Sequence, residues 1–275
     1  MQLASRFAHR SPVLRSNHPL SDDQIRTVAP SIFADTPHES RSERYSYIPT
    51  AAVLTELRKE GFQPFMVCQT RVRQEDRRDY TKHMLRLRHA SQINGAEVNE
   101  IILLNSHDGT SSYQMLAGMF RFVCQNGLVC GDTFADVRVP HKGNVTDHVI
   151  EGAYEVLHGF EQVQDSRDAM RAITLDDGEA EIFARSALVL KYDEPGKTLP
   201  ITESQVLHPR RFDDNHADLW SMFNRVQENL VKGGLNGRSA NGRQQRTRPV
   251  QGIDQNVRLN RALWLLADGL RKLKA

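Results

Sequence analysis

The spacing of apolar and polar positions changes near residue 140 of this chain. Before that point, residues 65–73, 83–89 and 100–104 form short apolar or alternating runs, which is the pattern of β-strands. Short charged or glycine-containing turns separate these runs, so we expect an antiparallel meander. Residues 112–117 and 128–139 extend the strand pattern, and residues 119–125 fit either a strand or a short helix.

Helical spacing dominates the second half of the chain. Apolar residues between Val149 and Val163 recur every three or four positions, and the same period returns in residues 182–190, 219–230 and 257–273. An earlier helix is expected to be capped by Thr50 and to be stopped by Gly61. Strands first and helices afterwards predict an α+β fold, with an antiparallel β-sheet meander in the N-terminal half covered by helices from the C-terminal half.

This pattern also predicts the domain organisation. Residues 1–43 are polar, contain several prolines and show little periodicity, so we expect an N-terminal arm. Residues 44–275 are expected to form a single α+β domain. Within it, residues 62–140 are strand-rich, residues 145–275 are helix-rich and residues 233–250 form a mobile basic loop.

Composition indicates an ordinary globular protein, because 39% of the 275 residues are hydrophobic and 25% are charged. No run approaches the roughly 18 apolar residues of a membrane span, and the first ten residues lack the apolar stretch of a secretion signal. Cys68, Cys124 and Cys130 lie among apolar neighbours and lack metal-ligand spacing, so we expect buried reduced thiols. A cytoplasmic protein without membrane contact, cofactor or metal is therefore expected.

The charge is unevenly distributed, although the net charge is only +2. Residues 41–90 carry 11 basic and 6 acidic side chains, residues 145–204 carry 5 and 13, and residues 205–275 carry 13 and 6. A polyanion would respond to the two basic segments, so the small net charge does not exclude nucleic-acid binding. The acidic segment could face solvent or dock against basic segments of a second copy, and we expect a homo-oligomer.

Two groups of basic residues are candidate contacts to nucleic acid. The first alternates with apolar residues along two predicted strands, which would display it on the outer face of the sheet; a solvated sheet face without a ligand is the alternative. The second lies in the glycine-rich loop, where spaced arginines could contact phosphates or simply keep the loop soluble. The first group is Arg71, Arg73, Arg77, Arg78, Lys82, Arg86 and Arg88, and the second is Arg238, Arg243, Arg246 and Arg248.

A polar motif directly follows the apolar run 101–104. Arg121 lies inside an apolar run, so its guanidinium must be paired, either with a carboxylate such as Asp108 or with a ligand phosphate. His83, His107 and Asp108 have the residue types of general acid–base chemistry, but a His-Asp-Gly turn is also a simple loop. A metal site formed by His107, His141 and His148 would require a convergence that the sequence does not show. The full motif comprises Asn105, Ser106, His107, Asp108, Thr110, Ser111, Arg121 and Asn126.

The same motif carries a family resemblance. The resemblance lies in residues 104–113, 118–121 and 123–128, with Arg44-Tyr-Ser-Tyr-Ile-Pro-Thr50, Tyr80-Thr-Lys-His-Met-Leu-Arg86, Gln227-Glu-Asn-Leu230 and Asn260-Arg-Ala-Leu-Trp264. In these residues the chain resembles the phage/plasmid-like family called domain of unknown function nine-three-two. The resemblance covers roughly residues 40–270. It implies a bacterial protein carried by mobile elements such as prophages and conjugative plasmids, and it implies no catalytic scheme.

These observations favour a nucleic-acid-binding protein of a mobile element. The expected partner is single-stranded DNA, bound without strong sequence preference for strand protection or annealing. One alternative is an enzyme acting on nucleic acid or nucleotide around His107, Asp108 and Arg121, although phosphate-binding glycine motifs are absent from the sequence. Another alternative is a protein-binding module that blocks a host defence factor.

Overall fold

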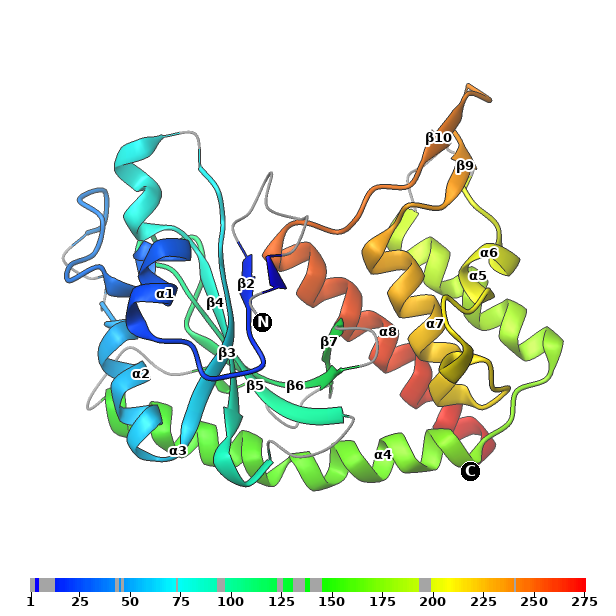
Figure 1. The fold of residues 1–275 in the computed structure, drawn as a ribbon, viewed down its shortest axis with the longest axis horizontal. Helices are drawn as coiled ribbons and strands as arrows, with labels where there is room; N and C mark the ends of the chain where they lie inside the picture. The colour runs from blue at the N-terminus through cyan, green and yellow to red at the C-terminus, as the bar shows by residue number, and fades with distance from the viewer. Residues whose placement is uncertain are drawn as a thin grey trace. The chain divides into compact units, whose positions relative to one another are not determined.

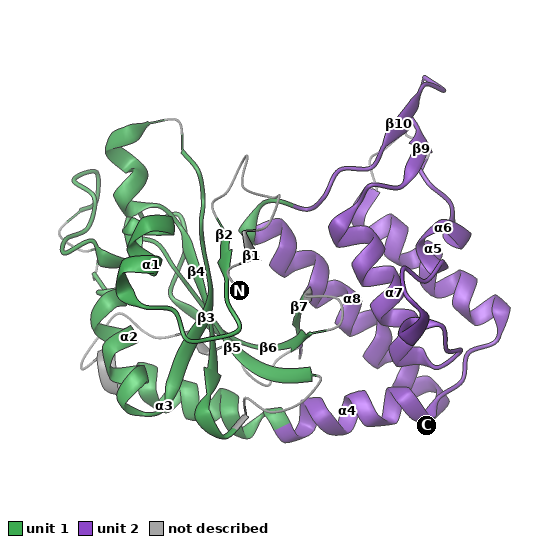
Figure 2. Cartoon of the chain, in the orientation of Figure 1, with its two compact units in different colours: residues 1–129, 133–160, 251–253 green, residues 130–132, 161–250, 254–275 purple. Residues whose placement is uncertain are grey.

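Two compact units make up the structure, a computed structural model (Figure 2). Unit 1 comprises residues 1–129, 133–160 and 251–253, and unit 2 comprises residues 130–132, 161–250 and 254–275. A single domain from residue 44 onwards stays a prediction, because compactness alone does not establish independent folding. The structure describes residues 3–4, 13–42, 45, 47–72, 74–92, 97–122, 126–130, 137–138, 145–192, 199–239 and 241–275.

Unit 1 is built on an antiparallel sheet, to which the described residues contribute eight strands (Figure 1). The strands follow the order β1-β2-β3-β4-β5-β6-β7, and β8 also pairs with β6, so the expected meander is confirmed for the long central strands. The strand bounds are Leu3–Ala4 for β1, Val13–Arg15 for β2, Phe62–Gln69 for β3, His83–His89 for β4, Glu97–Asn105 for β5, Gln114–Arg121 for β6, Asn126–Val129 for β7 and Val137–Arg138 for β8.

The register explains which side chains share a face of this sheet. Leu85 lies opposite Val67 of β3 and Leu103 of β5, and all three are buried. Residues 119–121, which also fitted a helix, continue strand β6, where Met119 pairs with Asn99. Because alternate residues point to opposite faces, Arg86 and Arg88 share the face opposite to Leu85.

Helices cover the sheet within unit 1. Helix α2 (Thr50–Lys59) buries Val53, Leu54 and Leu57 and packs against β3, and helix α3 (Val145–His158) packs against α2, β5 and β6 (Figure 1). Gly61 follows α2 with φ +87°, a conformation that glycine adopts without a Cβ penalty, so the expected helix stop is confirmed. The expected cap is wrong, because Pro49 is the N-cap and Thr50 is the first helical residue.

The segment 13–42, expected to belong to a polar arm, is folded into unit 1. Strand β2 pairs with β3, and helix α1 (Asp22–Val28) and the 3₁₀ helix η2 (Pro30–Phe33) bury Ile25 and Ile32. Ser21 begins α1 through a capping box with Gln24, which satisfies two backbone donors at the helix start. Two further 3₁₀ helices of unit 1 are η3 (Glu75–Tyr80) and η4 (Ala90–Gln92).

Unit 2 is a helical bundle that carries a β-hairpin (Figure 1). Trp264 of α8 meets Trp220 and Phe223 of α7 with ring centroids 6.4 and 6.1 Å apart, which forms the centre of an aromatic core. Its elements are α4 (Phe160–Ala172), α5 (Asp177–Tyr192), α6 (Glu203–Leu207), η5 (Phe212–Asp214), α7 (Leu219–Lys232), β9 (Asn236–Arg238), β10 (Gln244–Arg246) and α8 (Ile253–Lys274).

The predicted α+β class is confirmed, with the sheet in the N-terminal half and most of the helix in the C-terminal half. The described helices include none that is both long and apolar enough to cross a membrane. Cys68 and Cys130 are buried as expected, and burial raises the pKa of the Cys68 thiol to about 12; Cys124 lies outside the described residues.

Candidate nucleic-acid interface

The expected mobile loop at residues 233–250 contains a two-stranded antiparallel hairpin. Strands β9 and β10 extend beyond the helices of unit 2 (Figure 1), and the hairpin turns at Gly242, which has φ +73°. Backbone bonds from Ser239 N to Arg243 O and from Gly242 N to Ser239 O, both 2.9 Å, close the turn. The Asn-Gly turn allows the polar strands to satisfy each other's backbone groups, so the segment contains regular structure, while its mobility stays a prediction.

The base of the hairpin is fixed to the C-terminal end of α7. Gly233, with φ +61°, caps α7, and a Cβ there would lie 2.7 Å from the backbone carbon of Arg248. The amide of Gly234 donates to Thr247 O at 2.8 Å, and that of Val250 donates to Val231 O at 2.8 Å. Lys191 of α5 donates to Leu230 O at 2.5 Å, and burial lowers its pKa to about 8. The strands therefore rise from a rigid support.

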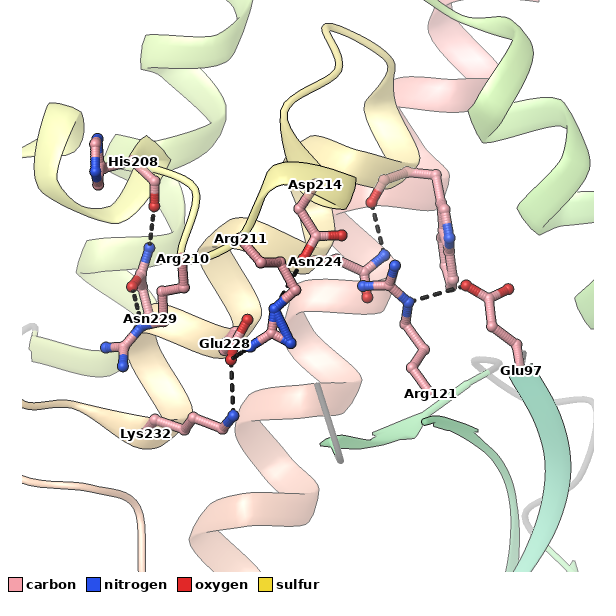
Figure 3. Close-up of polar contacts among 11 residues, drawn as sticks. Glu97, Arg121, His208, Arg210, Arg211, Asp214, Asn224, Glu228, Asn229 and Lys232 are labelled. Atoms are coloured by element: carbon pink, nitrogen blue, oxygen red, sulfur yellow. Dashed lines mark hydrogen bonds and ion pairs between the residues drawn. The ribbon is translucent and has the colours of Figure 1, made fainter. Parts of the chain in front are cut away.

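Polar side chains of α7 hold the segment that precedes it against the same support (Figure 3). Asn229 Nδ2 donates to Val206 O and His208 O at 2.8 and 2.9 Å, while its Oδ1 accepts a 2.6 Å bond from Arg210 Nε. Arg210 also donates to Gly233 O at 2.5 Å. Asn229 and Arg210 therefore connect residues 206–210 to the first residue of the hairpin segment.

Glu228 is the buried carboxylate of this cluster. It accepts hydrogen bonds from Arg211 and, at 2.7 Å, from Lys232, so its charge is neutralised in the interior (Figure 3). Gln227, the preceding residue, donates to Asn260 Oδ1 of α8 at 2.7 Å. The Gln227-Glu228-Asn229 motif thus serves to join α7 to α8, to residues 206–211 and to the hairpin base.

The two arginines within the strands, Arg238 and Arg246, share one exposed face of the hairpin, and Gln245 is exposed on the other. Residues directly opposite in an antiparallel pair share a face, so the pairs Arg238–Gln244 and Asn236–Arg246 lie on the same side. On the other side, a Cβ on Gly237 would overlap the carbonyl oxygen of Pro200, which shows how closely the hairpin rests on that segment. Residues 236–238 and 244–246 line a hollow of ≈ 520 Å³.

All four arginines of this segment are exposed. Arg238 and Arg246 lie within the strands, Arg243 lies in the turn and Arg248 follows β10. Residues 233–250 contain no acidic residue, so nothing within the segment neutralises them. The hairpin therefore presents four guanidiniums on a fixed backbone.

The first group of predicted contacts is divided by the structure. Arg71, Arg77 and Arg78 are exposed and Lys82 is half-buried, but Glu75, Asp76 and Asp79 occupy the same turn. Arg78 lies 3.7 Å from Glu75, a weak surface pair. Arg73 lies outside the described residues.

Arg86 and Arg88 are not displayed on an outer face. Each is 2% exposed, and both bind Glu100 of β5, at 3.0 Å from Arg86 Nη1 and at 2.9 Å from Arg88 Nε. The expectation that they share a face was right, but the expectation that this face is solvated was wrong. Glu100, one residue before the apolar run 101–104, supplies the charge that allows their burial.

Asn105 of the polar motif and His83 belong to a buried network at one end of the central strands. His83 places Nε2 2.9 Å from Thr50 Oγ1 and Nδ1 2.9 Å from Ser31 Oγ. Asn105 Nδ2 donates to Thr50 Oγ1 at 2.9 Å, so Thr50 connects two strands to the first turn of α2. Ser31 donates to Gln69 Oε1 at 2.9 Å, which extends the network to β3. Every member is nearly inaccessible to solvent.

His107, a candidate for acid–base chemistry, is part of the same interior. It is fully buried, with its ring 5.2 Å from that of His83 and 4.9 Å from that of Tyr47. Neither ring nitrogen makes a hydrogen bond of good geometry, although the backbone of Ser31 is near enough to favour the protonated form slightly. Burial lowers the pKa of His83 to about 3 and that of His107 to about 4, so both imidazoles are neutral near pH 7.

The other members of the motif do not converge on His107. Asp108 accepts bonds from Thr110 N at 3.0 Å and Thr110 Oγ1 at 2.6 Å, and Gly109 has φ +75°, so this turn is the simple loop considered above. Ser106 Oγ accepts from Ser111 N at 2.8 Å. Asn126 begins β7, opposite Arg121. The members of the motif therefore lie at both ends of β5 and do not form a single site.

Arg121 pairs with a different carboxylate from the one expected. Its Nε lies 2.9 Å from Glu97 Oε1 across the β5–β6 pair (Figure 3), and neither side chain is more than 9% exposed. The expected pair with Asp108 is therefore corrected. His148 lies 3.9 Å from Glu151, His141 lies outside the described residues, and the described part of the chain contains no group of three side chains arranged to hold a metal.

Comparisons with known proteins identify relatives but no activity. Residues 37–264 match the domain of unknown function DUF932. The chain is 57% identical to UPF0380 protein YfjQ and 56% identical to UPF0380 protein YafZ, both of Escherichia coli (strain K12), and each alignment covers 98% of this chain and 97% of the relative. No solved structure matches the chain.

Proposed function

The chain belongs to the DUF932 family, and we propose that this member binds nucleic acid, with single-stranded DNA as the ligand and the basic hairpin as the main contact surface. The observation that carries the proposal is the open face of the hairpin, on which Arg238 and Arg246 flank the amides of Asn236 and Gln244.

Charge supports the choice of a polyanion as the ligand. Four exposed arginines occur within 11 residues that contain no carboxylate, and the scaffold beneath them is fixed by α7. Guanidinium groups bind phosphate oxygens through two donors at once, which lysine cannot do. A rigid display also reduces the entropy that is lost when the side chains bind.

The shape of the hairpin supports an extended strand as the ligand. A two-stranded ribbon can lie along a nucleic-acid chain or enter a groove, and guanidinium planes also stack on unpaired bases. The amides of Asn236 and Gln244 can hydrogen-bond to base edges, which are accessible when the bases are unpaired. We therefore propose that the protein protects or anneals single-stranded DNA of a mobile element.

The salt dependence of binding tests the proposal quantitatively. If all four hairpin arginines engage phosphates of a labelled oligothymidine, affinity should fall about 50-fold between about 50 and 200 mM salt, from a slope of about −0.7 per phosphate. Fluorescence anisotropy measures this slope, with duplex DNA and RNA of equal length as competitors. Absence of binding to every nucleic acid at low salt would refute the proposal.

A charge-matched pair of variants locates the surface. Changing Arg238, Arg243, Arg246 and Arg248 together to Gln should remove most of the affinity and the salt slope, with little change in Tm because the side chains are exposed. The control changes the exposed Arg171, Arg185, Arg258 and Lys272 of unit 2 to Gln and should retain affinity within a few fold. Equal losses in the two variants would show that the hairpin is not the contact surface.

A further inference from the structure

Unit 1 contains a second feature that neither the family nor the proposed function explains. Arg86 and Arg88 are both buried, yet the carboxylate bound to them, Glu100, carries only one negative charge. The two guanidiniums and this carboxylate therefore leave one positive charge in excess in the interior of the sheet.

The hydrogen bonding of this cluster is incomplete as well. Arg86 Nε and Arg88 Nη1 are inaccessible to solvent and have no hydrogen-bond partner. Glu100 occupies one donor of each guanidinium, and Leu128 O takes a further bond from Arg86 Nη1 at 3.2 Å. Buried polar atoms without a partner are rare in proteins and call for a specific explanation.

A cavity lies against these side chains. Its volume is ≈ 90 Å³, several times the about 10 to 15 Å³ that a cavity needs to hold one water molecule. Arg86, Arg88 and Glu100 line it together with Arg15, Ser16 and Asn17. The space is therefore large enough for a small anion and lies beside the uncompensated charge.

Aromatic rings hold Arg88 in place at this cavity. Its guanidinium carbon lies 4.3 Å from the ring centroid of Phe65 and 4.8 Å from that of Phe120. Cation–π contacts of this kind stabilise a desolvated cation, but they do not neutralise its charge or satisfy its donors. The position of Arg88 is thus fixed while a donor remains available.

Gly127 provides comparable evidence for Arg86. A Cβ on Gly127 would overlap the guanidinium of Arg86, so the sequence leaves room for that group. Strand β7 therefore leaves space for the charged side chain of Arg86, although an apolar side chain would cost less free energy to bury there. Neighbouring residues thus fix the positions of both arginines, and fixed positions are typical of the side chains of a binding site.

From this arrangement we propose that the cavity binds one small oxyanion, a single phosphate or carboxylate group, which completes the hydrogen bonds of Arg86 and Arg88. The anion adds a second negative charge beside the buried Arg86, Arg88 and Glu100, and Arg15, a half-buried guanidinium on the same wall, adds a further cation. Ser16, half-buried on the cavity wall, provides a hydroxyl close to the bound group. The inference does not depend on the proposed function, because the hairpin lies in unit 2 and the cavity in unit 1.

Thermal unfolding of the full chain in chloride buffer at constant ionic strength tests the site. Inorganic phosphate, acetate and thymidine 5′-monophosphate are titrated separately to about millimolar concentration, where general salting effects are small. A saturating ligand should raise Tm by about 5 °C or more. A response to phosphate or acetate identifies a free ion, and a response to the nucleotide alone identifies a terminal phosphate, so each supports the site.

Arg88→Met is the variant that distinguishes a specific site from general stabilisation. It removes the excess charge, leaves Arg86 and Glu100 as a one-to-one pair, and places a flexible apolar side chain among the phenylalanines. We expect it to fold and to lose the ligand response. An equal response in Arg88→Met, or no response of the wild type to any of the three ligands, would overturn the proposal.

A second variant supplies the anion from the chain itself. Ser16→Asp places a carboxylate at the cavity wall, so it should raise Tm without added ligand and should abolish the response to phosphate. His18→Asp adds the same charge at an exposed neighbouring residue and should change neither. Identical behaviour of the two Asp variants would also contradict the site.

Discussion

Removing the charge of Glu100 is the most direct perturbation of the unit 1 interior. Glu100→Gln keeps the shape and one acceptor oxygen but leaves two buried guanidiniums without a counter-charge. Breaking a buried ion pair by removing one partner costs about 3 to 5 kcal/mol. Because the amide retains one acceptor, we expect a loss near the lower limit, about 3 kcal/mol of the free energy of unfolding.

The assay is urea denaturation followed by circular dichroism, with thermal unfolding in parallel. At about 2 to 4 °C per kcal/mol for chains of this size, Tm should fall by about 6 to 12 °C. The matched control is Glu56→Gln, because Glu56 pairs with Lys59 on the surface of α2, at 2.7 and 3.0 Å. Exposed pairs of this kind contribute about 0.5 kcal/mol or less.

A double variant shows whether the cost arises from uncompensated charge. Adding Arg88→Met to Glu100→Gln removes one of the two unneutralised guanidiniums, so the double variant should be more stable than the sum of the single losses by about 1 kcal/mol or more. If Glu100→Gln were as mild as Glu56→Gln, the two arginines would not need this carboxylate, and the charge argument for unit 1 would fail.

Two further predictions concern the interior of unit 1 and the hairpin turn. Gly127→Ala should displace Arg86 from Glu100 and lower the free energy of unfolding by about 1 to 3 kcal/mol through overpacking, and Arg86→Met should relieve much of that cost. Gly242→Ala should cost only about 1 kcal/mol, because of its positive φ. Urea denaturation compares these variants, and an unchanged stability of Gly127→Ala would contradict the packing. Because burial lowers the pKa of His83 to about 3 and that of His107 to about 4, the unfolded chain binds protons at a higher pH than the folded chain does. The free energy of unfolding should therefore be highest above about pH 6.5 and should fall towards pH 4, less steeply in His83→Gln. Equal pH slopes for the wild type and His83→Gln would contradict this.

Periodicity predicted the central elements well because their packing follows local pattern. Strand β4 has the predicted bounds His83–His89, and α7 and α8 contain the predicted apolar periods. The same rules could have found α1, since Ser21-Asp-Asp-Gln24 is a capping box and Ile25, Ala29 and Ile32 have helical spacing. A high content of proline and polar residues concealed that signal.

The hairpin was missed for a related reason. Four glycines and four arginines in residues 233–248 suggested a chain unable to bury enough apolar surface for order. Asn241-Gly242 nevertheless occupies the turn that a short hairpin needs, and the strands gain their support from α7 and Pro200 instead of a core of their own. Composition describes a segment alone, whereas order here arises from contacts with distant residues.

The buried charges show where sequence reasoning stops. Strand alternation correctly placed Arg86 and Arg88 on one face, but alternation cannot state what covers that face. Glu100 and Arg121 show the same sequence signal, which is a charged residue beside apolar residues of a strand. The strand register places Glu100 next to Arg86 and Arg88, and it places Arg121 next to Glu97. An embedded charge therefore predicts a pair, while the identity of the pair depends on the alignment of strands far apart in sequence. The excess of one arginine over the available carboxylate becomes visible only after that alignment is known, and it is what points to an anion in the cavity.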